Sequence, residues 1–245
     1  MKIDTSTLLR SQQQLIEKGF LASMSNWVIC APTGAGKTRM GEWALQMAAA
    51  DNRRGIYLAP LKAIVEEKTS DWNIRYPAIS IGLYTGETTR VAKHKRPKDE
   101  QFLLMTSEKM AAYLHNWKQN LDWLSEVDVV VIDEFHLLGD RSRGPTIESL
   151  IGRVQRINPF TRFIALSATI PNAMELATWM KAETFMTTWR PVPLTHRILR
   201  FKKAAHKPEF LINEVADTVK AGGQTLVFVN SRRRSESLAT ALVEA

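Results

Sequence analysis

The chain has 245 residues, 44% of them hydrophobic, which is enough to bury the core of one large domain or two small ones. Its formal net charge of +8 at pH 7 favours an anionic partner. Its single cysteine, Cys30, excludes a disulfide framework and a cysteine-based zinc site. No stretch approaches the length of a membrane span, and the start of the chain lacks an apolar signal segment. We therefore expect a cytoplasmic, monomeric protein that does not associate with a membrane.

Apolar strand-like runs alternate with helical segments along most of the chain. We expect strands at residues 27–30, 55–59, 79–84, 102–106, 127–132 and 163–167. The intervening segments predict helices at residues 39–50, 61–75, 108–118, 146–156 and 172–180. Such alternation indicates right-handed βαβ units. The sequence therefore predicts an α/β fold with a mostly parallel, doubly wound sheet and helices on both faces.

Two prolines near residue 190 interrupt this alternation, in the run Arg190-Pro191-Val192-Pro193. We therefore expect a first domain over residues 1–190 and a basic linker over residues 191–206. Beyond the linker, the pattern predicts a helix at 208–220, a strand at 225–229 and a helix at 235–244. Because one strand has no ladder partner within its own segment, residues 207–245 are expected to be the truncated start of a second domain.

A glycine-rich loop follows the first predicted strand, with the sequence Ala31-Pro32-Thr33-Gly34-Ala35-Gly36-Lys37-Thr38. It matches the P-loop pattern G-x-x-x-x-G-K-[ST] except at Ala31, where a small residue suffices. The glycines allow a turn whose N–H groups point toward nucleotide phosphates at the start of a helix. Lys37 can reach the β- and γ-phosphates, and the Thr38 hydroxyl can ligate Mg²⁺. The predicted nucleotide-binding residues of this loop are Thr33, Gly34, Ala35, Gly36, Lys37 and Thr38.

A pair of carboxylates follows the strand predicted at residues 127–132, a β-branched run typical of a buried parallel strand. This strand delivers Asp133 and Glu134 to the carboxyl end of the sheet, where ligands bind in open α/β folds. We expect Asp133 to hold Mg²⁺, through water, and Glu134 to orient and deprotonate the attacking water. Together with the glycine-rich loop, these carboxylates indicate a P-loop NTPase.

Positive charge is clustered in three places along the sequence. The clusters are Arg90, Lys93, Lys95, Arg96 and Lys98; Arg197, Arg200, Lys202, Lys203 and Lys207; and Arg232, Arg233 and Arg234. A solvated loop accounts for the first cluster as well as nucleic-acid contact does, and both interpretations stay open.

Further motifs give the chain a family resemblance over essentially its whole length. They are Ala59–Lys68, Thr85-Gly86-Glu87, Thr106-Ser107-Glu108-Lys109, His136–Glu148, Ser167-Ala168-Thr169-Ile170-Pro171, Arg190–Leu194 and Leu226–Arg232. With the two nucleotide motifs, they make the chain resemble the DExH helicases of superfamily two, in the Ski-like and archaeal Hel-like branch. The resemblance implies a RecA-like fold, ATP and Mg²⁺ as cofactors, and movement along a single strand from 3′ to 5′.

The resemblance also assigns roles to residues. It implies that Lys37, Asp133, Glu134 and His136 are catalytic. It places an adenine-sensing glutamine at Gln12, with Gln13 and Gln14 as alternative registers. It implies coupling between nucleotide and nucleic acid through Ser167, Ala168 and Thr169. The hydroxyls of Ser167 and Thr169 are expected to hydrogen-bond His136 or Asp133. The nucleic-acid contacts that it implies are Pro60, Leu61, Lys62, Thr85, Gly86, Thr106, Ser107, Lys109, Asn230, Ser231 and Arg232.

These expectations point to the ATP-binding motor domain of a nucleic-acid helicase. Its substrate would be single-stranded or forked nucleic acid, and DNA is favoured because the resemblance is strongest to archaeal repair helicases. Further C-terminal domains of the same enzyme would be its partners, and the arginines that complete the site would lie there. Such an arginine typically contributes about 10³–10⁵ in rate. We therefore expect weak nucleotide binding, poor hydrolysis and no unwinding by this chain alone.

Two other classes of protein remain as alternatives. The first is a P-loop NTPase that is not a helicase, and the motifs at 106–109 and 167–169 argue against it. The second is a nucleic-acid binding module with a vestigial nucleotide site. The presence of Lys37, Thr38, Asp133 and Glu134 argues against this second class.

Overall fold

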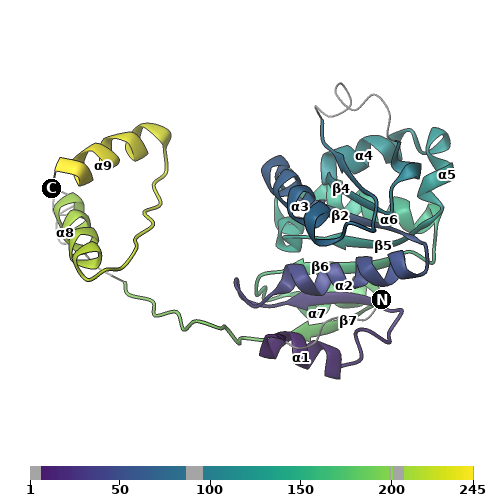
Figure 1. Cartoon of the computed structure of the whole chain (residues 1–245), viewed down its shortest axis with the longest axis horizontal. Coiled ribbons are helices and arrows are strands. Elements are labelled where there is room, and N and C mark those ends of the chain that lie inside the picture. Colours follow the sequence, from purple (N-terminus) through teal and green to yellow (C-terminus); the bar gives the residue numbers. More distant parts are fainter. Residues whose placement is uncertain (1–6, 87–95, 199, 201–206, 245) are drawn as a thin grey trace. The chain divides into compact units, whose positions relative to one another are not determined.

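The computed structural model describes residues 7–86, 96–198, 200 and 207–244. The chain falls into two compact units, Met1–Pro193 and Leu194–Ala245, and each is described by itself (Figure 1). The described part of the chain contains no helix long and apolar enough to cross a membrane. The glycine-rich loop and the Asp133-Glu134 pair both belong to the first unit.

The first unit is built on a seven-stranded sheet. Its strands are β1 (Asn26–Cys30), β2 (Arg54–Ala59), β3 (Ile81–Tyr84), β4 (Phe102–Thr106), β5 (Val127–Ile132), β6 (Arg162–Ser167) and β7 (Ala182–Met186). Their order is β3-β4-β2-β5-β6-β1-β7, and every neighbouring pair is parallel. The predicted parallel sheet is therefore confirmed, and all six predicted strands are present within two residues of their expected ends.

The seventh strand, β7, was not predicted from the sequence. It pairs with β1 at the edge of the sheet, from Asn26 opposite Ala182 to Cys30 opposite Met186. Only Phe185 of its five residues is fully buried. An edge strand that is covered on one face can keep polar residues, here Glu183 and Thr184. The segment therefore lacks the continuous apolar run that predicted the other strands.

Helices cover both faces of the sheet (Figure 1). The α-helices of the first unit are α1 (Arg10–Glu17), α2 (Lys37–Ala50), α3 (Lys62–Arg75), α4 (Ser107–His115), α5 (Leu121–Leu124), α6 (Gly144–Ile157) and α7 (Ala173–Met180). Three short 3₁₀ helices accompany them: η2 (Pro97–Asp99), η3 (Trp117–Gln119) and η4 (Phe135–Gly139). Because side chains alternate along each strand, residues of β1 contribute to two separate cores. Trp27 and Ile29 pack with α1, α2 and α3, whereas Val28 and Cys30 pack with α4, α5, α6 and α7.

The helix predicted at 108–118 is shorter in the structure. α4 ends at His115, and η3 follows it after Asn116. The Asn120 side chain donates hydrogen bonds to the carbonyls of Asn116, at 2.9 Å, and Tyr113, at 3.4 Å. It thus satisfies carbonyl groups at the end of the helix, which stops the α-helical pattern earlier than periodicity alone indicates.

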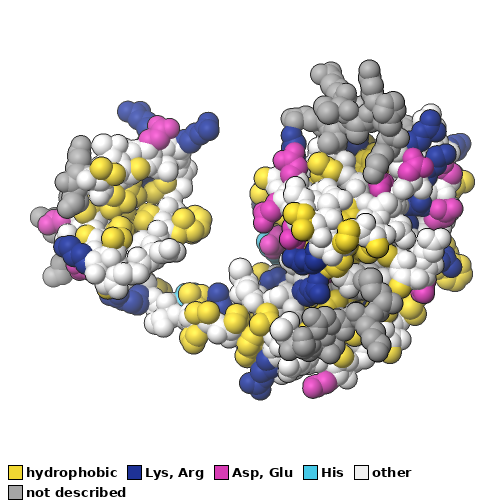
Figure 2. All heavy atoms as spheres, viewed as in Figure 1, with side chains coloured by type: hydrophobic (Ala, Val, Ile, Leu, Met, Phe, Trp, Pro, Cys, Tyr) yellow, Lys and Arg dark blue, Asp and Glu magenta, His cyan; other side chains and the backbone are white. Residues whose placement is uncertain are grey.

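The second unit contains the helices α8 (Lys207–Lys220) and α9 (Arg232–Glu244). The strand predicted at 225–229 is wrong, because these residues form no strand and Leu226 and Phe228 are 79% and 86% exposed. Its apolar pattern is that of a strand, but the described residues of this unit offer no second strand with which it could pair. Apolar side chains consequently remain visible between α8 and α9 (Figure 2).

Substitution of Trp72, on α3, tests the packing of the core between α3 and the sheet. Its indole is 1% exposed and lies edge-on to Tyr57 and Phe102, at centroid distances of 5.2 and 6.1 Å. We expect Trp72→Ala to lower the free energy of unfolding by about 3–5 kcal/mol in urea titration, because a large cavity forms. Phe160→Ala is the matched control, since Phe160 is 89% exposed, and it should change stability by no more than about 0.5 kcal/mol. Equal effects of the two substitutions would contradict this description of the core.

Candidate active site

The glycine-rich loop lies at the carboxyl edge of the sheet, between β1 and α2. Gly34 and Gly36 have φ angles of +85° and +80°, in the left-handed region that residues with a Cβ rarely adopt. α2 begins at Lys37, directly after Gly36. Its first N–H groups and the positive end of its dipole therefore face the loop, which is the arrangement that binds phosphate.

Lys37 lies folded across this loop. Its Nζ donates hydrogen bonds to the carbonyl of Ala31, at 2.7 Å, and to that of Pro32, at 3.1 Å. Burial lowers the pKa of Lys37, while the negative charges of Glu134 and Asp133 act in the opposite direction. The ammonium group is thus a partly buried positive charge held between the loop and the predicted catalytic carboxylates.

Asp133 follows β5 at the same edge, and both of its carboxylate oxygens accept hydrogen bonds. Oδ1 accepts from the N–H of Glu134 at 3.0 Å, and Oδ2 accepts from the hydroxyl of Tyr57 at 2.5 Å. Burial, then the charge and hydrogen bond of Asp133, raise the pKa of Tyr57 well above its ordinary value, and a hydrogen bond with Thr38 lowers it. Tyr57 was missed from the sequence because it stands within an apolar strand, where a tyrosine normally indicates core packing.

Glu134 has an unusual backbone conformation. Its φ of 51° and ψ of 45° lie in the left-handed region, which costs a residue with a side chain about 1–3 kcal/mol. The residue begins the turn into η4, and its Oε2 lies 3.3 Å from Nδ1 of His136. The structure therefore brings three of the predicted catalytic residues, Asp133, Glu134 and His136, together in one turn.

The hydrogen bond expected from Ser167 to His136 or Asp133 is not formed. The Ser167 hydroxyl is buried and has no hydrogen-bond partner among the described residues. Its carbonyl accepts from the N–H of Ala31 at 3.1 Å, so the end of β6 lies against the start of the glycine-rich loop. His136 pairs with Glu134 instead, while Ala168 is half-buried and Thr169 is exposed.

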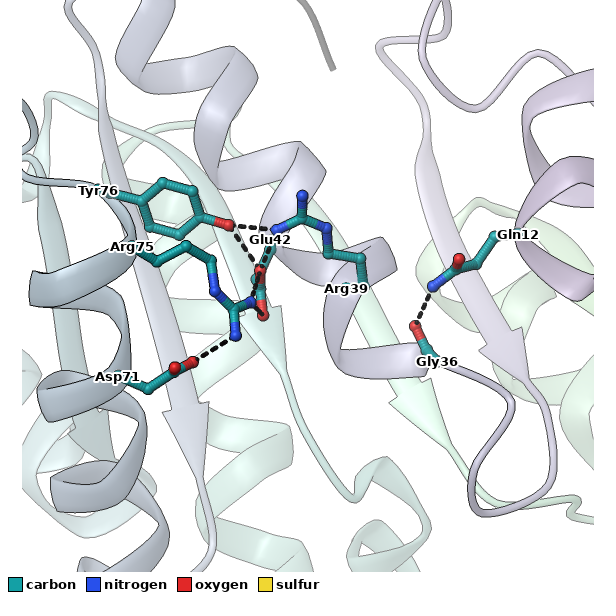
Figure 3. Close-up of polar contacts among 7 residues, drawn as sticks. All are labelled: Gln12, Gly36, Arg39, Glu42, Asp71, Arg75 and Tyr76. Carbon is teal, nitrogen blue, oxygen red and sulfur yellow. Dashed lines mark hydrogen bonds and ion pairs between the residues drawn. The ribbon is translucent and has the colours of Figure 1, made fainter. Parts of the chain in front are cut away.

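α1 is attached to the glycine-rich loop by two side chains. The Ser11 hydroxyl donates to the carbonyl of Ala35 at 2.7 Å, and Nε2 of Gln12 donates to the carbonyl of Gly36 at 3.3 Å (Figure 3). A Cβ at Gly36 would collide with the Gln12 side chain. The Gln13 side chain donates instead to the carbonyl of Leu8 at 3.3 Å, next to the start of its own helix. The geometry therefore favours Gln12 over the other two registers, and its contact with adenine stays a prediction.

Three of the predicted nucleic-acid blocks lie side by side. Residues 60–62, 85–86 and 106–109 follow β2, β3 and β4, which are neighbours in the sheet. Leu61 is 51% exposed, and Thr106 caps α4 by accepting a hydrogen bond from the N–H of Lys109 at 3.3 Å. The fourth block, Asn230, Ser231 and Arg232, belongs to the second unit, where the Ser231 hydroxyl accepts from the N–H of Arg234 at the start of α9.

The three clusters of positive charge lie partly within the described residues. Arg90, Lys93, Lys95, Lys202 and Lys203 lie outside the described residues. Arg197 pairs with Glu214 at 3.4 Å within the second unit. Arg96 and Lys98 flank the start of η2, where the Lys98 carbonyl accepts a hydrogen bond from Arg54. The function of the first cluster stays open.

The predicted magnesium ligands fit the chemistry of that ion. Thr38 and Asp133 offer a hydroxyl and a carboxylate, and hard oxygen ligands are those that Mg²⁺ prefers. The described residues contain no group of three or more His, Cys, Asp or Glu that could hold a metal ion. Mg²⁺ is commonly bound by one or two protein ligands, while the substrate phosphates and water give the others.

Residues 10–176, which contain both nucleotide motifs, match the family model described as DEAD/DEAH box helicase. The chain belongs to this family. Its fold is similar to that in the crystal structure of the DUF1998 helicase MrfA, with a TM-score of 0.78 and 24% identity. The likeness covers 98% of this chain and 38% of that chain, and it confirms the predicted RecA-like fold.

Several similar proteins carry the name ATP-dependent DNA helicase Hel308. The chain is 36% identical to the one from Methanocella arvoryzae over 93% of its length, and 35% identical to that of Methanocaldococcus jannaschii over 91%. It is 33% identical to that of Pyrobaculum calidifontis over 89%. The matches cover 32%, 20% and 32% of these relatives, so the chain spans a third of their length or less.

A buried carboxylate joins two helices of this DEAD/DEAH box helicase chain. Glu42 on α2 is 3% exposed, and it accepts from Arg39 at 2.8 Å, from Arg75 at 3.0 Å and from Tyr76 at 2.7 Å (Figure 3). Burial, then the adjacent Glu42, raise the pKa of Tyr76 to about 12. Arg75 also reaches Asp71 at 2.7 Å. The cluster fixes the end of α3 to the first turns of α2.

The segment after β7 returns to the glycine-rich loop of the helicase fold. The N–H of Thr187 donates to the carbonyl of Cys30 at 3.1 Å, at the end of β1. Pro191 then lies close to the loop, because a Cβ at Gly34 would be 3.8 Å from its Cγ. The arginine before it, Arg190, is near enough to Lys37 to lower the pKa of the lysine. The last residues of the first unit therefore lie over its predicted phosphate site.

Replacement of Glu42 by glutamine tests the role of the buried carboxylate. Glu42→Gln should lower the free energy of unfolding by about 1–3 kcal/mol, because three donors lose a charged acceptor. Urea titration measures this loss. Glu66→Gln is the matched control, since Glu66 is 47% exposed and lies 3.6 Å from Lys62, and it should cost no more than about 0.5 kcal/mol. If the two variants are equally stable, the cluster does not hold α2 and α3 together.

Proposed function

We propose that the chain is the ATP-binding motor domain of an ATP-dependent DNA helicase. The observation that supports this most is the placement of two sets of motifs on one edge of one sheet. The nucleotide motifs follow β1 and β5, and the predicted nucleic-acid blocks follow β2, β3 and β4. Family membership and the name shared by the three relatives support ATP and DNA as substrates. DNA is favoured over RNA for the same reason.

On the nucleotide side, Lys37 would exchange its two carbonyl partners for phosphate oxygens. The N–H groups at the start of α2 would donate to the same phosphates. Thr38 and Asp133 would hold Mg²⁺, which when bound compensates the charge of the phosphates. Glu134 would accept a proton from the attacking water, with His136 next to its carboxylate. Gln12 would bind the adenine of ATP while its amide remains close to Gly36.

On the nucleic-acid side, backbone and side-chain groups of the three blocks would hold one strand by its phosphates. Contacts to phosphate carry no base information, which suits an enzyme that moves along any sequence. The blocks begin α3 and α4 at residues 62 and 107, where free N–H groups favour phosphate binding. Residues 230–232 of the second unit would contribute further contacts, and domains that the longer relatives possess would act with this chain on forked DNA.

Two substitutions separate nucleotide binding from hydrolysis. Lys37→Ala should weaken the binding of a fluorescent ADP analogue by about 10–100-fold, because a charged hydrogen-bond donor to phosphate is lost. Glu134→Gln should bind the analogue as the unaltered chain does and lose residual ATP hydrolysis by about 10²–10⁴-fold. Fluorescence titration and phosphate release measure the two effects. Unchanged binding by Lys37→Ala would exclude the glycine-rich loop as the nucleotide site.

Salt dependence tests the nucleic-acid blocks. Single-stranded DNA of several sequences should bind equally, with a slope of log affinity against log salt of about −0.7 for each phosphate contact. The double variant Lys62→Ala/Lys109→Ala should make this slope shallower by about 1.4, because two contacts are lost. The matched control Arg153→Ala/Arg156→Ala removes equal charge from the end of α6. A control that changes the slope as much would show that only net charge matters.

A further inference from the structure

Tyr57 lies at the centre of the first unit, on β2, between the sheet and α3. Its side chain is 0% exposed, and its ring lies edge-on to Trp72 at 5.2 Å. The Nζ of Lys68, also on α3, lies 5.4 Å from the ring centroid. The ring is thus fixed by packing, and the position of its hydroxyl is fixed with it.

The Tyr57 hydroxyl contacts one of the side chains that are predicted to ligate Mg²⁺. It donates a hydrogen bond to Oδ2 of Asp133 at 2.5 Å. Tyr57 stands on β2, and Asp133 follows β5, the strand that pairs with β2 in the sheet. The phenolic hydroxyl therefore ties the predicted metal ligand to the neighbouring strand.

The direction of this hydrogen bond follows from the chemistry of its members. An ionised carboxylate can only accept, so the Tyr57 proton points to Asp133. The other carboxylate oxygen, Oδ1, accepts from the N–H of Glu134 at 3.0 Å. Both oxygens are thus held in place by donors of the protein, and their remaining lone pairs are left for a cation.

We propose that Tyr57 is a positioning residue of the metal site, which orients the Asp133 carboxylate toward Mg²⁺. The proposal rests on the proposed function, since it requires nucleotide and metal to bind here. Tyr57 itself does not touch the nucleotide or the metal. It acts as the outer partner that fixes the orientation of one ligand, and loss of such a partner commonly weakens metal binding by about 10–100-fold.

Tyr57→Phe removes the hydroxyl alone, because the phenylalanine ring can keep the contacts with Trp72 and Lys68. Tyr84→Phe is the matched control. Tyr84 is 8% exposed and its hydroxyl is buried without a hydrogen-bond partner among the described residues, so its loss should leave the metal site unchanged. Thermal melting of both variants checks that each is folded before binding is measured.

Manganese serves as the probe, because free Mn²⁺ is counted directly by electron paramagnetic resonance. In the presence of saturating ADP, Tyr57→Phe should bind Mn²⁺ about 10–100-fold more weakly than the unaltered chain. Its affinity for ADP in EDTA should stay within twofold, since the hydroxyl does not contact the nucleotide. Tyr84→Phe should match the unaltered chain in both measurements.

A double-mutant cycle with Asp133→Asn separates positioning from a general structural effect. If Tyr57 acts through Asp133, adding Tyr57→Phe to Asp133→Asn should cause a much smaller further loss of Mn²⁺ affinity than it does alone. Equal Mn²⁺ affinity of Tyr57→Phe and the unaltered chain would overturn the inference, and so would fully additive losses. Failure of the unaltered chain to bind ADP and Mn²⁺ would instead contradict the proposed function.

Discussion

The all-parallel sheet is the constraint on which the rest of the first unit depends. Parallel strands present all their carboxyl ends at one edge, and the glycine-rich loop, the Asp133-Glu134 pair and three of the predicted nucleic-acid blocks each follow such an end. The order of the strands then divides this edge into two regions. β1, β6 and β5 carry the predicted nucleotide groups, whereas β2, β4 and β3 carry the predicted nucleic-acid blocks. β2 pairs with β5 on one side and with β4 on the other, so it forms the boundary between them.

Buried polar side chains join neighbouring elements of the first unit. Tyr57 connects β2 with Asp133, Gln12 connects α1 with the glycine-rich loop, and Glu42 connects α2 with the end of α3. An apolar side chain would pack in each place without fixing orientation, while a satisfied hydrogen bond also defines direction. α2 is consequently held at its start by α1 and on its side by α3, so the helix under the predicted phosphate site is rigidly placed.

Much of this arrangement could be predicted from the sequence, and the exceptions share a physical reason. The buried strands and the motifs at 31–38 and 133–136 were found because local patterns determine them. β7 and the contacts of Tyr57 with Asp133 and of Glu42 with Arg75 depend on residues that are distant in the sequence, which a local pattern does not contain. The strand expected at 225–229 is wrong for the opposite reason. Its apolar pattern is present, but the described residues of the second unit form no strand with which it could pair. Ser167 likewise ends a strand as predicted, but its hydroxyl faces the inside of the unit rather than His136.

The left-handed backbone of Glu134 has a consequence for the stability of the first unit. Glycine or asparagine would adopt that conformation more readily, and either would relieve about 1 kcal/mol of strain. The fold by itself would thus be better served by a different residue at position 134. The glutamate therefore costs stability at the position where a catalytic carboxylate is predicted.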